Sequence, residues 1–463
     1  MQISVIGLGK LGASMAACFA HRGFKVIGVD ISHKVVDAIN NASAPVQETG
    51  LNEMIKANRD RLKATLSHEE AVLNSDISFV IVPTPSDERG AFSLQYVSWA
   101  YKEIGRALAK KKNYHNVVLT STVLPGSTRQ VLIPILEKES GKKAGKDFGV
   151  CYSPEFIALG SVIENFLNPD FTLIGELDER SGSELEKLYA MVVENKAPSA
   201  RMSIEMAELT KIAVNTFVTT KITFANMLAE ICENIPGGDV DVVTRALGLD
   251  SRIGHKYLKG GLGYGGPCFP RDNIALSFIA KQLGVQAKLA EVTDSMNRSI
   301  PNRVTEKLKE ILRPNSTVAI LGLAYKPFSH VTEESQSLYI AEALSKAGYR
   351  VIGYDPLAGE MALQELHGHI VVLDNLKECL NQAEAVLIAT PHPEFEKLEA
   401  EDFKNQYRKV TVIDFWRMMK KLENEDHINY IAFGKSNDDT ANTKRLKQIW
   451  LGTKEKPSEA VKS

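Results

Sequence analysis

Residues 1–30, MQISVIGLGKLGASMAACFAHRGFKVIGVD, place a glycine-rich turn between two short β-branched runs. The first run predicts a buried strand over 2–6, and the second predicts a strand over 24–29. An apolar segment that ends near Ala20 lies between them and predicts a helix. Strand, glycine turn, helix and strand in this order are typical of a dinucleotide-binding unit.

The turn carries Gly7, Gly9 and Gly12 in the spacing GxGxxG. Glycines at these positions allow a tight turn and the close approach of a pyrophosphate to the N-terminus of the following helix. Asp30 ends the second predicted strand, where its carboxylate can accept hydrogen bonds from both ribose hydroxyls. The same carboxylate would repel a 2′-phosphate, so the sequence favours NAD over NADP.

The chain has 463 residues, which predicts two or three domains, and its formal net charge is only −2. No basic patch stands out, so we expect no nucleic-acid partner. No signal peptide is recognisable and no apolar run is long enough to span a bilayer, so we expect a cytoplasmic protein without a membrane partner. Five scattered cysteines fit a reducing compartment and indicate neither a disulfide framework nor a metal site.

Two predicted strands, 77–82 and 117–120, end in segments that carry Thr84 and Thr122. Ligands of parallel sheets bind at the carboxyl ends of the strands, so both threonines are expected to face the cofactor. The alternative, that they are turn-forming hydroxyls, is equally compatible with these residues alone.

A further predicted strand over 150–152 leads to Glu155, which could be a general base or a solvated loop carboxylate. Residues 173–175 are predicted to form the edge strand that closes this domain.

From about Met202, apolar residues repeat with a helical period until Pro236. The pattern predicts a long helix that is apolar over much of its surface, which favours packing in a dimer. Lys211 and Asn215 project from one face of this helix and could together hold an oxyanion. A salt bridge on a solvated face is the simpler alternative for this pair.

Residues 261–272 read GLGYGGPCFPRD. The glycines let the backbone approach a ligand, and Pro267 and Pro270 stiffen the loop around Cys268. Asp272 comes within reach of the thiol if a helix begins here. A cysteine presented beside a carboxylate indicates a nucleophile that acts on a bound ligand, with a buried, inert cysteine as the alternative.

Helices are expected over 273–300 and 304–312, and a second alternation of strands and helices follows. Its predicted strands cover 317–321, 350–354, 385–389 and 410–413, with a helix over 337–347. This region lacks GxGxxG, so we expect it to bind something other than a second dinucleotide. The fold is therefore predicted to be α/β, with two Rossmann-like, doubly wound parallel-sheet domains joined by a long central helix and a helical dimerisation region.

The expected domains are a cofactor domain (1–200), a central helical domain with the cysteine loop (201–312), a second sheet domain (313–440) and a poorly ordered charged tail (441–463).

Over about residues 1–435, the chain resembles the UDP-glucose/GDP-mannose dehydrogenases, which are NAD-dependent nucleotide-sugar dehydrogenases. The motifs that carry the resemblance are GxGxxG with Asp30, VPTP (82–85), STVLPGST (121–128), SPEF (153–156), AELTKIAVNTF (207–217), GYGGPCFPRD (263–272) and GLAYKP (322–327). Several separated motifs in one order are far more specific than any single one.

The resemblance implies oxidation of the C6 hydroxyl of a nucleotide-sugar to the acid, with two NAD molecules reduced. The Cys268 thiolate would hold the aldehyde as a thiohemiacetal and then as a thioester, which water hydrolyses. Lys211 and Asn215 would stabilise the oxyanion. Asp272, Thr122 and Glu155 match residues that hold water and accept protons.

The resemblance also implies two sets of binding residues. Cofactor binding would involve Gly7, Gly9, Gly12, Asp30, Lys34, Thr84 and Thr122. Substrate binding would involve Phe156, Lys211, Arg252, Tyr257, Lys259, Gly265, Lys326 and Arg417, with Arg252 reaching the substrate of a partner subunit. The last sheet domain would bind the UDP or GDP moiety, no metal is expected, and the long helix would form the core of a homodimer or higher homo-oligomer. The usual context of the family is polysaccharide biosynthesis.

Three residues depart from the family pattern. Leu159 stands where the glucose enzymes carry a second glutamate, Glu333 replaces an expected arginine, and Pro267 replaces a frequent serine. The first departure weakens glucose as the sugar, and the second removes a positive charge expected near a phosphate. A UDP-hexose such as UDP-glucose is the favoured substrate, with UDP-N-acetylhexosamine or GDP-mannose as alternatives.

Two further alternatives are a two-electron β-hydroxyacid dehydrogenase and an NAD- or nucleotide-binding regulator without activity. The first needs neither Cys268 nor the second sheet over 315–435. The second is disfavoured by the presence of Cys268, Lys211, Asn215 and Asp272.

Overall fold

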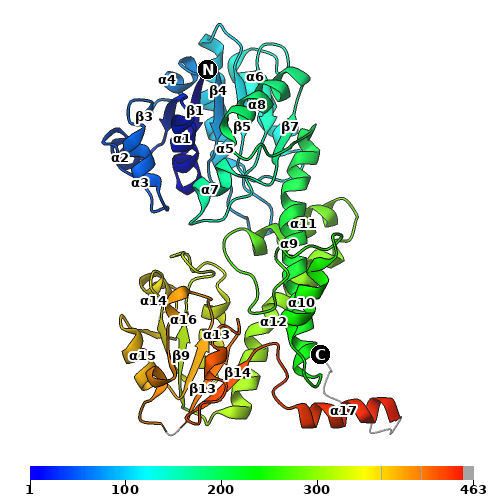
Figure 1. Ribbon diagram of the computed structural model, residues 1–463. Coiled ribbons are helices and arrows are strands. Elements are labelled where there is room, and N and C mark those ends of the chain that lie inside the picture. The colour runs from blue at the N-terminus through cyan, green and yellow to red at the C-terminus, as the bar shows by residue number, and fades with distance from the viewer. Residues whose placement is uncertain (367, 408, 452–463) are drawn as a thin grey trace. The chain divides into compact units, whose positions relative to one another are not determined.

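The computed structural model describes residues 1–366, 368–407 and 409–451. The chain forms two compact units (Figure 1). Unit 1 contains residues 1–214 and 274–286, and unit 2 contains residues 215–273 and the chain from 287 onward.

The sheet of unit 1 has eight strands in the order β3-β2-β1-β4-β5-β6-β7-β8. Their bounds are β1 Gln2–Ile6, β2 Lys25–Val29, β3 Leu62–Thr65, β4 Ile77–Val80, β5 Asn116–Leu119, β6 Gly149–Tyr152, β7 Thr172–Glu176 and β8 Ser199–Ser203. All neighbours are parallel except β6 and β7. The chain runs outward from β1 in one direction and from β4 in the other. The point of reversal between these two strands is where such sheets bind ligands.

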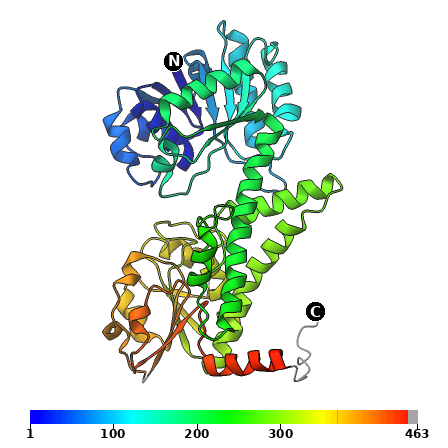
Figure 2. The same ribbon diagram turned by 45° about the vertical axis from the view of Figure 1, so that its right-hand side comes forward.

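Helices cover both faces of this sheet (Figure 2). They are α1 Lys10–His21, α2 His33–Asn40, α3 Leu51–Ala57, α4 His68–Leu73, α5 Gln95–Lys110, α6 Ile133–Ser140, α7 Val162–Leu167 and α8 Glu179–Val192, with a π-helical turn over Thr128–Leu132. Helix α11, Phe269–Gln282, begins in unit 2 and continues in unit 1, because the boundary follows Asn273. One apolar core includes residues of α1, α3 and α8, and a second includes residues of α4, α5 and α6. The two cores confirm the predicted doubly wound arrangement.

Strand β7 corrects one prediction, because residues 173–175 do not form the edge of the sheet. β8 pairs with β7 in parallel and takes the edge position. The sequence of β8, SARMS, shows no apolar alternation, and its residues are half-buried or exposed. The strand is stabilised by its backbone pairing and by Arg201, whose guanidinium contacts the carboxylate of Glu176 at 2.6 Å.

The predicted long helix is α9, Ile204–Glu233, which has 30 residues. The boundary between the two units falls within it, between Val214 and Asn215. Phe217, Phe224 and Ile231 remain exposed along it, with exposed fractions of 64%, 44% and 47%. In the part of the chain that the structure describes, no helix combines the length and apolar character that a membrane span requires.

The sheet of unit 2 has six parallel strands in the order β11-β10-β9-β12-β13-β14. Their bounds are β9 Thr317–Leu321, β10 Arg350–Tyr354, β11 Val371–Val372, β12 Ala385–Ile388, β13 Val410–Asp414 and β14 Ile428–Ala432. The helices are α10 Val240–Leu249, α12 Lys288–Ile311, α13 Gln336–Lys346, α14 Gly359–Glu365, α15 Leu376–Gln382, α16 Pro393–Glu396 and α17 Asp439–Leu451. Four of the strands match the predicted ones, whereas β11 and β14 were not predicted.

Helix α17 corrects the expectation of a poorly ordered end over residues 440–451. Buried Asn442 donates from Nδ2 to the carbonyl oxygen of Glu233 at 2.9 Å. Asp439 accepts a hydrogen bond from the backbone N–H of Gly237 at 2.8 Å. These contacts with the end of α9 are formed far along the chain, so the local charge pattern could not reveal them. Residues 452–463 of the predicted tail lie outside the described residues.

Candidate active site

The glycine turn lies at the reversal point of the unit 1 sheet. Gly7 has φ +94°, and a Cβ there would lie 2.2 Å from the carbonyl oxygen of Ile81. A Cβ on Gly12 would lie 1.8 Å from the carbonyl oxygen of Gly7. Around a Cβ built on Gly9, by contrast, no atom lies within 4 Å. The backbone is therefore packed beneath the turn and open at Gly9, before the N-terminus of α1, which fits the pyrophosphate of a dinucleotide.

Asp30 follows β2 and its carboxylate is fixed by two backbone groups. Oδ2 accepts from the N–H of Leu8 and Oδ1 from the N–H of Ser32, both at 2.9 Å. This places an ordered acceptor beside the glycine turn, as ribose recognition requires. Lys34 lies exposed in the first turn of α2.

Thr84 and Thr122 lie after β4 and β5 and are joined directly. The buried hydroxyl of Thr84 donates to the carbonyl oxygen of Thr122 at 2.7 Å. The two predicted strand-end segments are therefore brought together. The contact joins residues 38 apart in the chain, so it links two loops and is not a turn-forming bond of Thr84.

Glu208 is a buried carboxylate that was not predicted from the sequence. It lies on α9 and accepts hydrogen bonds from the backbone N–H groups of Gly126, at 2.6 Å, and Thr128, at 2.9 Å. Burial raises the pKa of this carboxyl. Glu208 thus fixes the loop that carries Thr122. The available signal was a glutamate within an apolar helical run.

Lys211 and Glu155 meet within unit 1. The ammonium of Lys211 donates to the backbone carbonyl of Glu155 at 2.7 Å and lies 4.6 Å from the ring centroid of Phe156. Burial raises the pKa of the Glu155 carboxyl to about 8, although the positive charge of Lys211 and a hydrogen bond from Tyr189 oppose the rise. A carboxyl with such a pKa can exchange a proton near neutral pH.

Cys268, Asp272 and Asn215 meet within unit 2. The predicted helix begins at Phe269, directly after the exposed Cys268. Asp272 lies buried in its first turn, and its N–H donates to the carbonyl oxygen of Cys268 at 2.9 Å. Asn215 on α9 donates from Nδ2 to Oδ2 of Asp272 at 2.6 Å. The thiol thus lies at a helix N-terminus, which favours negative charge.

Two buried asparagines hold the glycine loop before Cys268, and neither was identified from the sequence. Asn226 on α9 accepts from the N–H of Gly261 at 2.8 Å. Asn297 on α12 accepts from the N–H of Tyr264 and donates to its carbonyl oxygen, both at 2.9 Å. A Cβ on Gly263 would lie 2.1 Å from Oδ1 of Asn297. The loop therefore needs glycine to pack against its clamp.

Buried polar groups thus follow one another along α9, and each is bound to another segment of the chain. They are Glu208, Lys211, Asn215 and Asn226. We call these four residues the polar stripe of α9.

Among the predicted substrate residues, Gly265 and Lys326 belong to adjoining segments of unit 2. A Cβ on Gly265 would lie 2.3 Å from the carbonyl oxygen of Glu334, and the N–H of Gly266 donates to the carbonyl oxygen of Glu333. Lys326 lies in the same 322–335 segment. The segment with the Glu333 departure is therefore packed against the cysteine loop.

Three other predicted substrate residues lie at the surface. Tyr257 is half exposed and has φ +61°. Lys259 is exposed, with its ammonium 6.0 Å from the ring centroid of Trp416. Arg252 is exposed and contacts Asp250 of its own chain at 2.6 Å.

Arg417 does not fit its predicted role in substrate binding. The residue is buried, and its five N–H donors are used by the two carboxylate oxygens of Asp241 and by the carbonyl oxygens of Phe415, Phe433 and Gly260. The geometry therefore assigns Arg417 to the interior of unit 2. The motif alone could not show that the fold supplies these acceptors.

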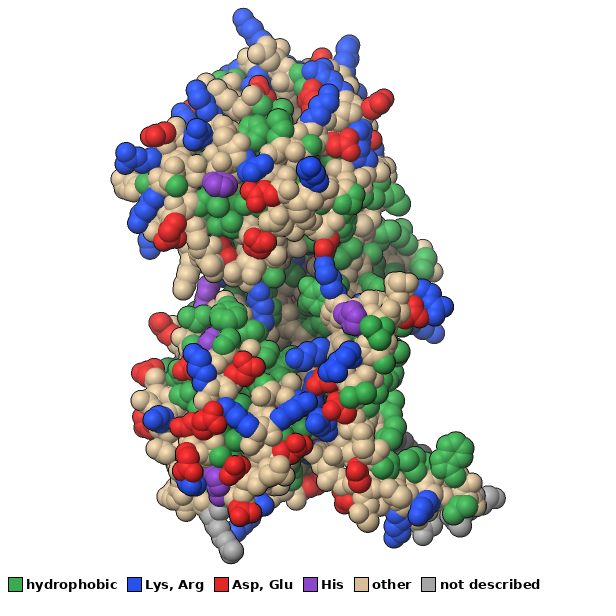
Figure 3. Space-filling model, viewed as in Figure 1, with side chains coloured by type: hydrophobic (Ala, Val, Ile, Leu, Met, Phe, Trp, Pro, Cys, Tyr) green, Lys and Arg blue, Asp and Glu red, His purple; other side chains and the backbone are tan. Residues whose placement is uncertain are grey.

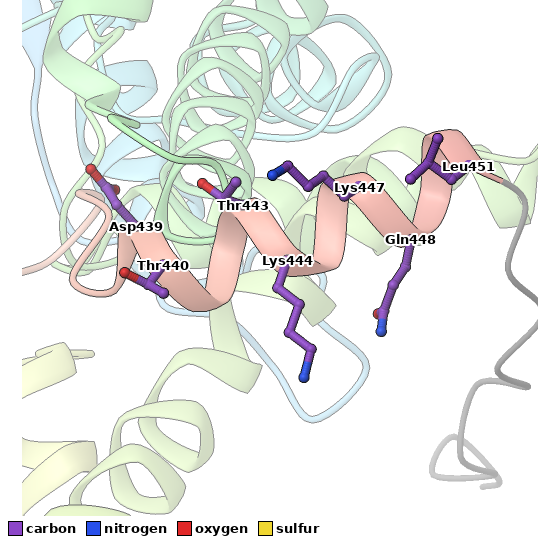
Figure 4. Close-up of a pocket in the computed structure, with 7 residues that line it drawn as sticks. All are labelled: Asp439, Thr440, Thr443, Lys444, Lys447, Gln448 and Leu451. Atoms are coloured by element: carbon purple, nitrogen blue, oxygen red, sulfur yellow. The ribbon is translucent and has the colours of Figure 1, made fainter.

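The surface hollow that lies along one helix does not coincide with the predicted site. A hollow of about 610 Å³ runs along α17 and contains none of the predicted site residues (Figure 4). Basic and acidic side chains are interspersed on the face shown in Figure 3. Within the described ranges, no group of three or more His, Cys, Asp or Glu side chains could hold a metal ion.

An NAD-dependent dehydrogenase is the class of protein that the open glycine turn and the ordered Asp30 carboxylate define. Models of the UDP-glucose/GDP-mannose dehydrogenase family match three parts of the chain: the NAD binding domain over residues 1–193, the central domain over 205–299 and the UDP binding domain over 319–421. The chain belongs to this family and is an NAD-dependent nucleotide-sugar 6-dehydrogenase.

Similar proteins extend over almost the whole chain. The UDP-glucose 6-dehydrogenase AglM of Haloferax volcanii is 37% identical over 92% of this chain and 99% of its own length. The GDP-mannose 6-dehydrogenase of Azotobacter vinelandii is 35% identical over 90% of this chain and 97% of its own. A solved UDP-glucose dehydrogenase from Pyrobaculum islandicum is similar with a TM-score of 0.85 and 34% identity, over 94% of this chain and 98% of that one.

Proposed function

We propose that this dehydrogenase oxidises the C6 hydroxyl of a UDP-hexose, with UDP-glucose as the favoured substrate, to the uronic acid through a covalent intermediate on Cys268. The observation that carries the proposal is the group formed by Cys268, Asp272 and Asn215. In this group, Nδ2 of Asn215 donates to Oδ2 of Asp272 at 2.6 Å. A two-electron dehydrogenase would not need this group. The match of residues 319–421 to the family's UDP binding domain supports a UDP-sugar, and the similarity to UDP-glucose dehydrogenases at 34–37% identity is compatible with glucose.

GDP-mannose and UDP-N-acetylhexosamine are the alternative substrates. Several relatives that are 35–38% identical are GDP-mannose 6-dehydrogenases, so identity alone does not separate the two nucleotides. Leu159 stands where the glucose enzymes carry a glutamate, so this position does not favour glucose over another sugar.

In the proposed reaction, the glycine turn and Asp30 would hold NAD, which would supply the acceptor for the hydride from C6. Glu155, with a water held near Thr122, accepts the proton of the C6 hydroxyl. Lys211 and Asn215 stabilise the negative oxygen. The Cys268 thiolate adds to the aldehyde carbon to give a thiohemiacetal, whose oxidation by a second NAD gives a thioester. Water then adds to the thioester and releases the acid and the thiol, with Asp272 positioned to take the proton from water.

We assign the binding residues accordingly. Gly7, Gly9, Gly12, Asp30, Lys34, Thr84 and Thr122 bind the cofactor. Phe156, Lys211, Arg252, Tyr257, Lys259, Gly265 and Lys326 bind the nucleotide-sugar. The cofactor domain covers 1–200, the central domain 201–312 and the nucleotide-binding domain 313–440.

The exposed apolar residues Phe217, Phe224 and Ile231 support a homodimer or higher homo-oligomer formed through α9, with Arg252 reaching the substrate of the partner subunit. We also propose a cytoplasmic enzyme that supplies polysaccharide biosynthesis.

The test is NADH formation by the purified chain with UDP-glucose, GDP-mannose and a UDP-N-acetylhexosamine, counted per molecule of sugar consumed. Two NADH per sugar with one donor would support the two-step oxidation and identify the substrate. One NADH per sugar would mean that the reaction stops at the aldehyde, and Cys268 would lose its role. Turnover with GDP-mannose alone would replace the favoured substrate.

A further inference from the structure

A chain of buried oxygen atoms connects Glu155 to the interior of unit 1. Ser153, directly after β6, lies 2.8 Å through Oγ from the carbonyl oxygen of Leu173 on β7 and 2.8 Å from the hydroxyl of Tyr189 on α8. The Tyr189 hydroxyl lies 3.4 Å from Oε1 of Glu155. Ser153 and Tyr189 are 1% and 3% exposed, so bulk water does not replace these contacts.

The protons along this chain are limited in number. A carbonyl oxygen only accepts, so the Ser153 proton goes to Leu173 and the Ser153 oxygen is left to accept. Tyr189 has one hydroxyl proton and two acceptors for it, Ser153 and Glu155. The shorter distance to Ser153 shows that the serine competes for this proton.

We propose that Tyr189 is a positioning residue that controls the proton occupancy of Glu155, and that Ser153 competes with Glu155 for the Tyr189 proton. When Glu155 is protonated, its O–H can donate to Tyr189, Tyr189 to Ser153 and Ser153 to Leu173, so every proton has an acceptor. When Glu155 is ionised, Tyr189 turns its proton to the carboxylate, and Ser153 loses its donor. Ionisation of Glu155 is therefore coupled to the rotation of one buried hydroxyl.

The other groups that face Glu155 come from two helices. Lys211 on α9 favours the ionised carboxylate through its charge. Cys18 on α1 is buried, and the charge of Glu155 helps to raise the pKa of its thiol, so this cysteine stays neutral. Burial of Glu155 opposes ionisation. Tyr189 thus modulates a carboxyl that already exchanges its proton near pH 8.

The inference rests on the proposed role of Glu155 as a proton acceptor, and opposite shifts in the pH profile test it. The rate should rise with pH as Glu155 ionises. In Tyr189→Phe, the carboxylate loses a donor, so this rise should move by about one unit to higher pH. In Ser153→Ala, the competitor is lost, so the rise should move to lower pH.

Matched variants separate these shifts from general damage. Ser153→Cys keeps the buried volume but supplies only a weak acceptor, so it should shift the profile in the same direction as Ser153→Ala. Tyr114→Phe removes another phenol hydroxyl of unit 1. The charged neighbours that act on the pKa of Tyr114 include Asp178, Glu184 and Arg180 but not Glu155, so this variant should leave the pH–rate profile unchanged. Shifts in one direction for both Tyr189→Phe and Ser153→Ala would overturn the inference.

A second readout does not depend on turnover. The carboxylic acid C=O stretch of Glu155 can be titrated in the full chain by infrared difference spectroscopy, with Glu155→Gln as the blank. The midpoint of this titration can shift in opposite directions in Tyr189→Phe and Ser153→Ala while the pH–rate profiles do not shift. In that case the inference stands and the proton-acceptor role of Glu155 fails. The inference fails if the rise of the rate with pH depends on Glu155 but Tyr189→Phe shifts neither this rise nor the infrared titration midpoint. The proposed role of Glu155 stands in that case.

Discussion

The side-chain amide of Asn215 lies 2.6 Å from Oδ2 of Asp272, and both residues are buried. Asn215 belongs to the long helix α9, whereas Asp272 lies in the first turn of α11, directly after the cysteine. This hydrogen bond, together with one from Asn273 to Thr219 at 3.0 Å, fixes the start of α11, and with it Cys268, to the central helix. A charge-assisted bond of this kind stabilises more than a bond between neutral groups.

Asn215→Ala should lower both stability and activity. The variant removes a donor from a buried carboxylate, which costs about 1–3 kcal/mol of unfolding free energy. Urea unfolding and kcat should both be measured. Asn234→Ala is the matched control, because Asn234 is exposed just after the same helix, where its amide donates to Glu230 and accepts from Arg445, and loss of these exposed contacts should cost little. Equal losses in both variants would contradict the special role of the Asn215 contact.

Cys268→Ser should still bind NAD and the nucleotide-sugar but should form no acid, because a serine hydroxyl is a much weaker nucleophile than a thiolate. Product analysis by mass spectrometry gives the measurement. Cys379→Ser, which changes a buried cysteine of the second sheet domain, controls for the substitution itself. Two NADH per sugar in Cys268→Ser would rule out the covalent route.

Asp30→Ser should weaken the preference for NAD over NADP. The carboxylate is held by the N–H groups of Leu8 and Ser32, so its negative charge stays beside the ribose position. Removing the charge removes the repulsion of a 2′-phosphate. The ratio of kcat/KM for the two cofactors is the quantity to compare. Wild-type enzyme that prefers NADP would contradict the role of Asp30.

Glu155→Gln should be more stable than the wild type at pH 9 but not at pH 4. The folded pKa, about 8, lies above the ordinary value of 4.5, so the folded state holds the proton more tightly than the unfolded state. The contribution of protonated Glu155 to the free energy of unfolding is therefore complete below pH 4.5 and is lost as the pH rises through 8. Tm measured across this range for both proteins checks the sign. A constant difference in Tm would mean that Glu155 ionises as in the unfolded chain.

For His115, we expect the opposite dependence of the free energy of unfolding on pH. It is fully buried, with Nε2 near the Ser78 hydroxyl and Nδ1 near the Ser75 carbonyl oxygen. Burial lowers its pKa from 6.5 to about 3. The unfolded state therefore binds the extra proton between these values, so stability is complete above pH 6.5 and is lost as the pH falls toward 3.

In His115→Gln, this loss should be absent, so the stability difference between the two proteins should change by up to about 1.4 kcal/mol per pH unit in that window. Urea unfolding at pH 7, 5.5 and 4 measures it. Parallel curves would show that His115 does not contribute.

The predictions that succeeded rest on local patterns. The turn after β1 was recognised from the spacing of Gly7 and Gly12, where an added Cβ would lie 2.2 Å and 1.8 Å from a backbone carbonyl oxygen. Strands β9 and β10 were recognised because buried parallel strands are continuous apolar runs. The long helix followed from its period.

The predictions that failed depend on partners far along the chain. β8 is a strand because β7 lies beside it, and α17 is ordered because Asn442 reaches the end of α9. Arg417 is an internal residue because the fold brings Asp241 to it. Glu208, Asn226 and Asn297 were missed for the same reason, since a polar residue in an apolar run shows its purpose only when its acceptor or donor is known.

The polar stripe of α9 also restricts which mutations the chain can tolerate. Each residue added to a helix rotates everything after it by about 100° and advances it by about 1.5 Å. A single insertion or deletion between Glu208 and Asn226 would thus turn part of the stripe away from the segments that it binds, even if every side chain were kept. Substitutions are compatible with this helix at many exposed positions, but changes in its length are not. Between Glu208 and Asn226, the number of residues in the helix is therefore under stronger constraint than their identities.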